Sequence, residues 1–373
     1  MDRKTKTIFS ILGTVLIPLA AQADQAMSNN QRSDRTQTQP LYVSGESVKT
    51  GQLPAGYNAS AAYKCMDGQD VFVSADYIYW NWNQDSFKRG ELVVTSSTIS
   101  GSQEHQYLNA GYASGFQVGL GFNMPGMDDW NLCADYTWYK NSGKLDVDTD
   151  ALHLFRFLSR TTDTLTYRKG PASFEMKMDF NEFDLLLKRP FYFGKKLTAN
   201  LIAGLDALWI TQNYDLAASG YVGSAASAVT TADTRAVSLK TKAWSLGPKF
   251  GLDTNWMLGY GLSILANISA SLLYTSYYDL SVNNTFTQLS GTFTVTDSVP
   301  HNLNVLRPIS KMFLGLGWNM GLCDNSFRLG FSGGYDFGMY WNYDMINFTN
   351  TNGNSASGNM YLQGLNLQAR FDF

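Results

Sequence analysis

The chain is poor in the residues that build most enzyme and metal sites. Of its 373 residues, only three are cysteine and three are histidine. His105, His153 and His301 lie far apart in the sequence, so the spacing of a zinc site or of a catalytic triad is absent. No phosphate-binding glycine loop and no CxxC pair occur either. These absences predict a protein that is not an enzyme and that uses neither a metal nor another cofactor.

A long apolar run is present only at the start of the chain. Positively charged residues up to Lys6 precede an apolar run over 8–20 and the segment Ala21-Gln22-Ala23. This layout predicts a signal peptide over 1–23, cleaved after Ala23. The polar stretch 24–70 is then expected to be a flexible periplasmic segment. This run is shorter than the ~20 apolar residues of a spanning helix, and no other run reaches that length either, so membrane insertion has to use strands.

Excess positive charge is missing as well. The chain has 28 basic and 31 acidic residues, and removal of the signal peptide leaves 25 and 30, a net charge of −5. This balance argues against nucleic acid as a partner. Cys65, Cys133 and Cys323 are an odd number in an exported protein, so at least one thiol is free or paired with another chain. The abundant residues are 22 Phe, 21 Tyr, 9 Trp and 33 Gly, a mixture that favours strands and turns.

The last segment, 360–373, alternates strictly between apolar and polar residues. Leu365, Leu367, Ala369, Phe371 and Phe373 fall on one face, and the residues between them are polar or glycine. A period of two over this length predicts a strand with one face in lipid and the other in water. An edge strand of a soluble sandwich has the same pattern, so the rest of the chain has to decide between the two.

Nine earlier segments repeat this alternation, and several carry aromatic residues at the ends of the apolar face. The ten predicted strands are 71–83, 116–124, 130–138, 174–187, 197–209, 244–252, 258–274, 312–318, 327–341 and 361–373. Short turns alternate with long loops between them, which is the connectivity of an outer-membrane barrel. The sequence therefore predicts an all-β, antiparallel, up-and-down transmembrane barrel over 71–373. It has 10–14 strands, because 92–99 and 286–296 are either extra strands or tall hairpins, and the last strand pairs with the first.

Three local features are less regular. The apolar face of the fourth strand changes phase between Phe180 and Phe183, which predicts a β-bulge. The segments 211–236 and 279–304 are polar and are expected to be loops. Another loop contains the run 152–158, for which a short helix is one option.

The inward positions of the predicted strands carry charges of both signs. Such residues either line a water-filled path for solutes or pair across a narrow, closed lumen. The tentative pore-lining residues are Asp76, Asp135, Asn200, Asp206, Lys249, Lys311, Arg328, Asp336 and Arg370.

Four segments, 72–80, 115–122, 135–139 and 369–373, resemble the major outer membrane proteins of the Legionella and Chlamydia-like type. The resemblance implies a pore-forming protein of the bacterial outer membrane, a porin-like channel for passive diffusion of small hydrophilic solutes or ions. Chlamydial members cross-link through many cysteines, whereas this chain has three. The terminal Phe371 and Phe373 resemble a signal for the barrel assembly machinery.

The alternative function is a structural or adhesive surface barrel whose extracellular loops bind host or matrix ligands. The partners expected from the sequence are outer-membrane lipids, the assembly machinery and small hydrophilic solutes, with a homo-oligomer as a further option.

Overall fold

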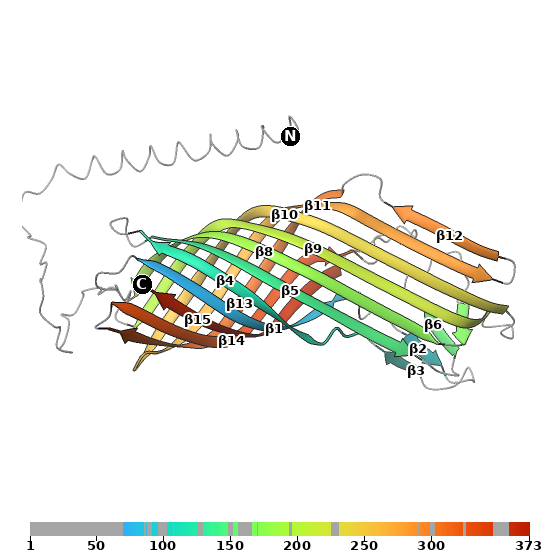
Figure 1. Ribbon diagram of the computed structural model, residues 1–373, viewed down its shortest axis with the longest axis horizontal. Helices are drawn as coiled ribbons and strands as arrows, with labels where there is room; N and C mark the ends of the chain where they lie inside the picture. The colour runs from blue at the N-terminus through green and yellow to red at the C-terminus, as the bar shows by residue number, and fades with distance from the viewer. Residues whose placement is uncertain are drawn as a thin grey trace, which may run out of the picture. The chain divides into compact units, whose positions relative to one another are not determined.

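Ten antiparallel strands close into a barrel in the computed structural model of the chain (Figure 1). The residues that the structure describes are 70–85, 87, 92–95, 103–106, 108–124, 130–147, 152–155, 166–169, 171–193, 196–224, 231–288, 291–298, 303–323, 326–345 and 358–373. The predicted signal peptide and nearly all of the predicted periplasmic segment, 1–69, lie outside these residues.

Each barrel strand pairs with the next one along the chain, as an up-and-down barrel requires. The strands are β1 (Val71–Gln84), β4 (Tyr112–Asn123), β5 (Asn131–Val147), β8 (Ala172–Phe193), β9 (Leu197–Ser224), β10 (Thr231–Gly259), β11 (Leu262–Gln288), β13 (Leu303–Leu322), β14 (Phe327–Asp344) and β15 (Gly358–Asp372). The prediction of a closed antiparallel barrel with at least ten strands is confirmed.

The barrel closes where β15 pairs with β1, with Ala75 opposite Ala369. The main chains of Val71 and Phe373 exchange two hydrogen bonds at the end of this seam, of 3.1 and 2.9 Å. Closure leaves neither strand with an unpaired edge. The predicted pairing of the first and last strands is therefore correct.

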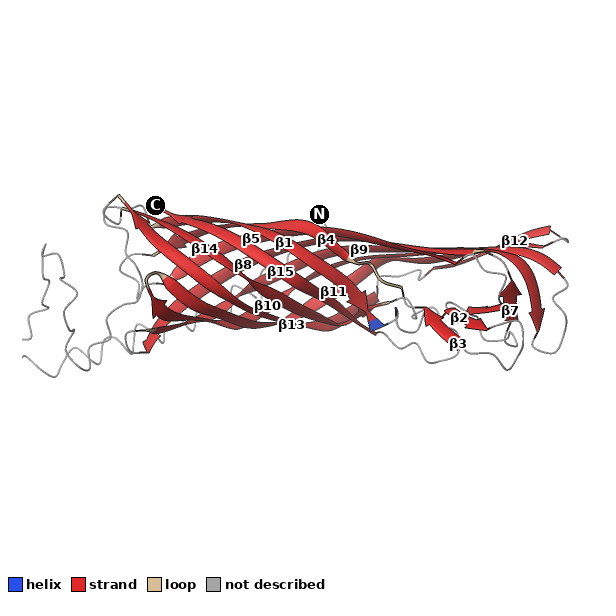
Figure 2. Cartoon of the chain, turned by 90° about the horizontal axis from the view of Figure 1, so that it is seen from below, coloured by secondary structure: helices blue, strands red, loops and turns tan. Residues whose placement is uncertain are grey.

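Five short strands lie outside the barrel wall. They are β2 (Leu92–Thr95), β3 (Gln103–Gln106), β6 (Leu152–Phe155), β7 (Thr166–Lys169) and β12 (Gly291–Ser298). They gather at the end of the barrel opposite the C-terminus (Figure 2). The option of a short helix over 152–158 is wrong for its described part, because Leu152–Phe155 forms a strand paired with β2 and β7.

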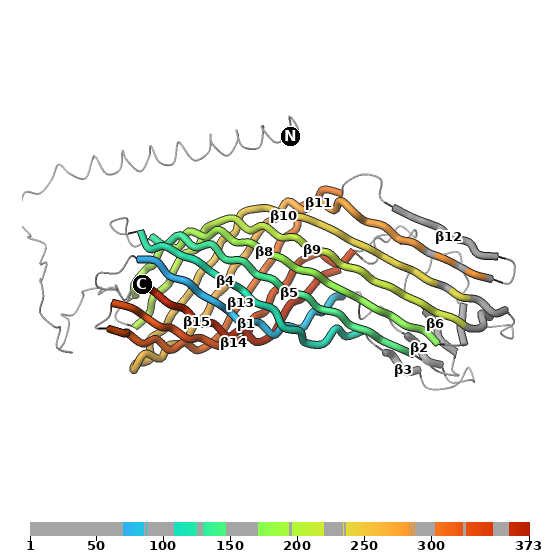
Figure 3. The backbone as a smooth tube through the Cα atoms, viewed as in Figure 1, coloured from blue at the N-terminus to red at the C-terminus, as the bar shows by residue number. Residues whose placement is uncertain are grey.

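Two predicted loops are largely strand. β9 continues to Ser224 and pairs with β10 from Thr231, so the segment 211–236 is the upper part of a tall hairpin. β11 likewise continues to Gln288 and pairs with β12. The neighbouring strands β8, β9, β10 and β11 can be followed together in Figure 3. Long and short connections alternate as predicted, but two of the long ones are extended hairpins.

The outer wall carries an apolar belt. On β9, the outward side chains from Leu201 to Trp209 are apolar or small, and Thr211, Asn213 and Asp215 follow on the same face. This apolar stretch matches the roughly 9–11 residues of a strand that crosses a bilayer. Trp138, Trp209, Trp244 and Tyr274 mark the belt's edge on the long-loop side, where aromatic residues meet lipid headgroups. No helix among the described residues is long and apolar enough to cross a membrane.

The predicted β-bulge in β8 is wrong. The register of β8 with both neighbours is continuous, and every second residue from Phe174 to Leu186 points inward and is buried. What changes is the polarity of the two faces. Above the belt the inward residues are apolar and the outward ones polar, while within the belt Phe183 and Leu185 face outward and Glu182 and Asp184 face inward. β8 therefore passes from lipid into water without slipping.

Candidate functional site

A polar cavity of about 400 Å³ occupies the lumen of the barrel. It extends from Asn131 and Asn255, near the short turns, up to Trp80, Tyr340 and Leu362. In outer-membrane barrels the short turns face the periplasm. The cavity therefore belongs to the periplasmic part of the lumen.

Most of the predicted pore-lining residues meet at this cavity. Those that line it are Asp76, Asp135, Asn200, Lys249, Lys311, Asp336 and Arg370. Asp206 is fully buried just outside the lining, where it accepts a 2.7 Å hydrogen bond from Ser271 Oγ. Arg328, near the short-turn end of β14, is not part of the lining. The structure thus places the residues, and their role in solute passage stays a prediction.

Five charged residues cross the lumen at the top of the cavity, and we call them the charged layer. They are Glu182, Asp184, Asp206, Lys249 and Lys311. Lys249 Nζ lies 2.6 Å from Asp184 Oδ2, and Lys311 Nζ donates to Glu182 Oε1. The second pair joins β13 to β8, which are four strands apart around the barrel. These ion pairs brace the lumen internally.

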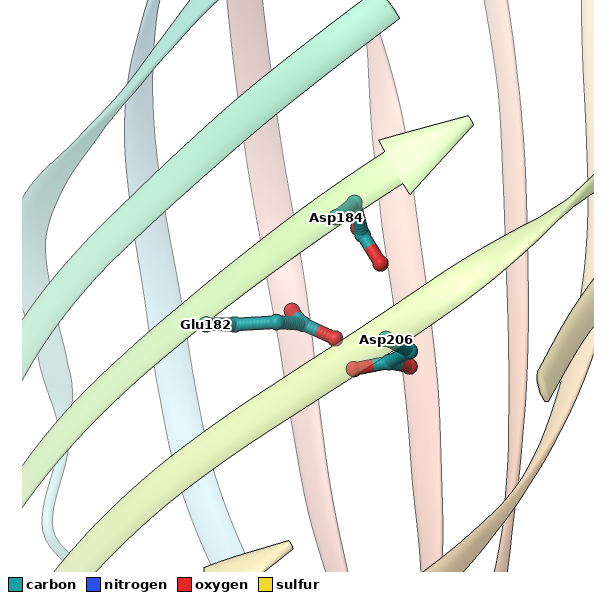
Figure 4. Close-up of side chains that lie close together, drawn as sticks. All are labelled: Glu182, Asp184 and Asp206. Carbon is teal, nitrogen blue, oxygen red and sulfur yellow. The ribbon is translucent and has the colours of Figure 1, made fainter. Parts of the chain in front are cut away.

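The three carboxylates of the charged layer converge, as Figure 4 shows. Glu182, Asp184 and Asp206 each place one oxygen within 4.8 Å of the others. Oxygen ligands of this kind suit Mg²⁺ or Ca²⁺. Here, however, two lysine ammonium groups already contact two of the carboxylates and supply most of the countercharge. The arrangement fits a buried ion-pair network better than a divalent metal site.

An apolar layer of buried side chains fills the lumen above the charged layer. Its largest fully buried members are Trp82, Tyr139, Tyr277, Tyr340, Tyr343, Phe87, Phe180, Ile78, Met176, Leu208 and Leu239. Side chains from diametrically opposite strands touch here. The rings of Phe180 on β8 and Tyr340 on β14 are 5.7 Å apart, and Gln212 Nε2 on β9 lies 3.3 Å from Met360 Sδ on β15. The layer closes this section of the lumen.

Two further charged contacts hold the lower wall of the cavity. Lys188 Nζ lies 3.1 Å from Asp253 Oδ2. Arg370 Nη2 lies 2.5 Å from Asp372 Oδ1, and its guanidinium carbon sits 3.6 Å from the centre of the Phe72 ring. Every basic side chain that lines the cavity therefore already has an acidic partner.

The sequence interpretation missed Glu182, Asp184, Lys188 and Asp253. The predicted bulge in β8 caused two of these omissions. It put Phe180 and Phe183 on the same face of the strand, so Glu182 and Asp184 were not recognised as inward residues. Continuous counting from Phe180 to Leu186 would have placed both carboxylates inward. His105 and His153 are far apart in the sequence, but their backbones both pair with β2, which puts their strands about 10 Å apart.

Solved outer-membrane barrels are similar in structure but distant in sequence. The outer membrane protease OmpT from Escherichia coli has a TM-score of 0.39 and 11% identity, covering 84% of this chain and 99% of its own. A major outer membrane protein from Thermus thermophilus has a TM-score of 0.27 and 12% identity, covering 81% and 99%. The TodX monoaromatic hydrocarbon channel, as a deltaS2S3 mutant, has 0.23 and 11%, covering 83% and 91%. Scores and identities this low bear on neither activity nor substrate.

The sequence comparison is more decisive. No curated protein sequence matches the chain. Residues 64–373 match the family described as the Legionella pneumophila major outer membrane protein precursor. This match covers the whole of the described barrel and agrees with its apolar belt and closed strand order. The chain therefore belongs to this family of bacterial outer-membrane proteins.

Proposed function

We propose that the protein is a non-enzymatic, porin-like channel for small hydrophilic solutes, and that its resting lumen is closed by the apolar layer. The observation that carries this proposal is the cavity of about 400 Å³ lined by charges of both signs inside a closed barrel. Charged groups along a lumen supply a wet path and tune which solutes enter it. Membership of an outer-membrane protein family supports the same role.

Passage through this lumen needs movement of wall side chains. Phe180 and Tyr340 are 0% and 1% exposed and reach each other from opposite strands. Ten-stranded barrels are narrow enough for side chains to fill, unlike porins with sixteen strands or more. Conductance is therefore small and intermittent, because it depends on brief openings of the apolar layer.

Planar-bilayer recording of the purified, refolded protein tests the proposal. The native barrel is expected to give small, brief openings, and Phe180→Ser/Tyr340→Ser is expected to give larger and longer ones. The matched control is Phe183→Ser, a change on the lipid-facing side of the same strand. Heat-modifiable gel mobility verifies folding of every variant. A folded double variant with no conductance above background would overturn the proposal.

The second candidate is a structural or adhesive surface barrel, and the sealed lumen specifically favours it. β9, β10 and β11 have 28, 29 and 27 residues, about three times the length needed to cross a bilayer. These strands carry an extended sheet beyond the membrane. Replacing 216–237 by a two-residue turn, which joins the paired residues Asp215 and Ser238, is expected to abolish binding to host cells or matrix if this candidate is correct. Retained binding by a folded barrel would reject it.

A further inference from the structure

Three carboxylates on one wall of the cavity have no ion-pair partner among the described residues. They are Asp76 on β1, Asp135 on β5 and Asp336 on β14, and these strands lie within one arc of the barrel, β14-β15-β1-β4-β5. Asp135 and Asp336 are both near enough to Asp76 to repel its charge. The basic side chains around the cavity are bound elsewhere, to Asp253, Asp184, Glu182 and Asp372.

Two side-chain amides hold this acidic wall in place. Gln368 Nε2 donates to Asp76 Oδ2 at 3.2 Å, and Asn366 Nδ2 donates to Asp336 Oδ2 at 2.9 Å. Trp80 Nε1 adds a 3.2 Å hydrogen bond to the same oxygen of Asp336. Asp76 is only 6% exposed, and its Oδ1 is buried without a hydrogen-bond partner. A buried carboxylate oxygen without a hydrogen-bond partner is costly, and an ammonium donor that reaches it would remove this cost.

Aromatic rings complete the wall and favour an organic cation over a metal ion. Trp80 and Phe72 line the same cavity as the three carboxylates. The cavity already holds cations over rings, with Arg370 over Phe72 and Lys311 Nζ 5.8 Å from the Tyr340 ring centre. Ammonium groups donate hydrogen bonds to carboxylates, while methylene groups and ring faces exclude water together. The volume falls within the range of small-molecule sites.

We propose that the cavity binds a small aliphatic diamine or short polyamine, with one ammonium group at Asp76 and Asp336. A second ammonium group is directed towards Asp135. The inference deepens the proposed passage of hydrophilic solutes and rests on it, since it names the solute class. Binding itself needs only access from the short-turn end.

Isothermal titration of the purified full-length barrel in detergent tests the inference. The probes are 1,4-diaminobutane, the isosteric but uncharged 1,4-butanediol, and Mg²⁺. The native barrel is expected to bind the diamine in preference to the other two. Asp76→Asn/Asp336→Asn is expected to weaken diamine binding roughly tenfold to a hundredfold, as loss of a charge-assisted hydrogen bond does.

The matched control is Asp279→Asn, since Asp279 lies above the belt beside Lys240 and Lys242 and leaves the cavity unchanged. Equal binding of diamine and diol, binding of Mg²⁺ alone, or an unchanged affinity of the folded double variant would each overturn the inference. Diamine binding by a barrel that never conducts would overturn the channel and keep the site. Conductance without diamine binding would overturn the site and keep the channel.

Discussion

At the scale of single residues, the charged layer shows how the lumen tolerates buried charge. Lys249 and Asp184 are 6% and 7% exposed and lie 2.6 Å apart. Replacement by Lys249→Met leaves the carboxylate buried without a countercharge. The expected loss of unfolding free energy is about 3–5 kcal/mol. Denaturant unfolding in detergent, followed by tryptophan fluorescence, measures it.

The control for this prediction is Lys240→Met, because the exposed Lys240 lies 3.4 Å from Asp279 above the apolar belt. Exposed pairs of this kind contribute about 0–1 kcal/mol. Lys249→Met/Asp184→Leu, which removes both charges, is expected to recover most of the lost stability. Equal destabilisation by Lys249→Met and Lys240→Met would show that the buried pair has no special role.

Residue identity and alternation alone were sufficient to place seven of the nine predicted residues at the cavity. Asp76 and Asp336 could be assigned to the inner face because their neighbours on both sides are apolar and face outward, and Lys311 because it alternates with Met312 and Leu314. The pairing of these charges could not be predicted. It depends on which strands lie opposite each other, and alternation within one strand contains no information about that.

At the scale of elements, β9 explains why the strands predicted from the sequence are too short. Tyr214, Leu216 and Ala218 alternate with Asn213, Asp215 and Ala217, so the period of two continues above the belt. The composition there is polar because the outer face meets water, and this polarity resembled that of a loop. Alternation identifies a strand, but it does not say which face looks into the barrel.

The closing strand β15 carries the element-scale prediction. Deletion of Phe373 removes both main-chain hydrogen bonds to Val71 and a ring stacked 5.9 Å from Phe371. It also removes the proposed signal for the assembly machinery. We expect lower levels of folded protein at the cell surface, measured by immunoblotting of outer-membrane fractions before and after heating.

The control is Trp256→Ala, which removes an outward-facing aromatic side chain at the same end of the barrel but on β10, across the barrel from the closing seam. This variant is expected to reach nearly the native surface level. Native levels of the Phe373 deletion, or an equal loss in both variants, would contradict an assembly role for the terminal residue.

At the scale of the whole barrel, the change from apolar to polar residues on the outer face shows how far the wall extends beyond the membrane. Leu205 faces outward within the apolar belt, and Asn213 faces outward eight residues further along β9, beyond Trp209. Trp209 marks the edge of the lipid-facing part. At about 3.3 Å per residue, Asn213 lies roughly 13 Å further along the strand. The wall at Asn213 is therefore exposed to water outside the cell.

Labelling of intact cells with a membrane-impermeant maleimide tests this placement. Asn213→Cys is expected to react at once, whereas Leu205→Cys stays unlabelled because lipid covers it. The native Cys323 lies exposed beside the β13–β14 turn at the short-turn end, and Cys133 is buried, so the parent chain provides the background. Cys323 is expected to react only after the outer membrane is permeabilised. Labelling of Cys323 in intact cells, or protection of Asn213→Cys, would require the opposite orientation of the barrel.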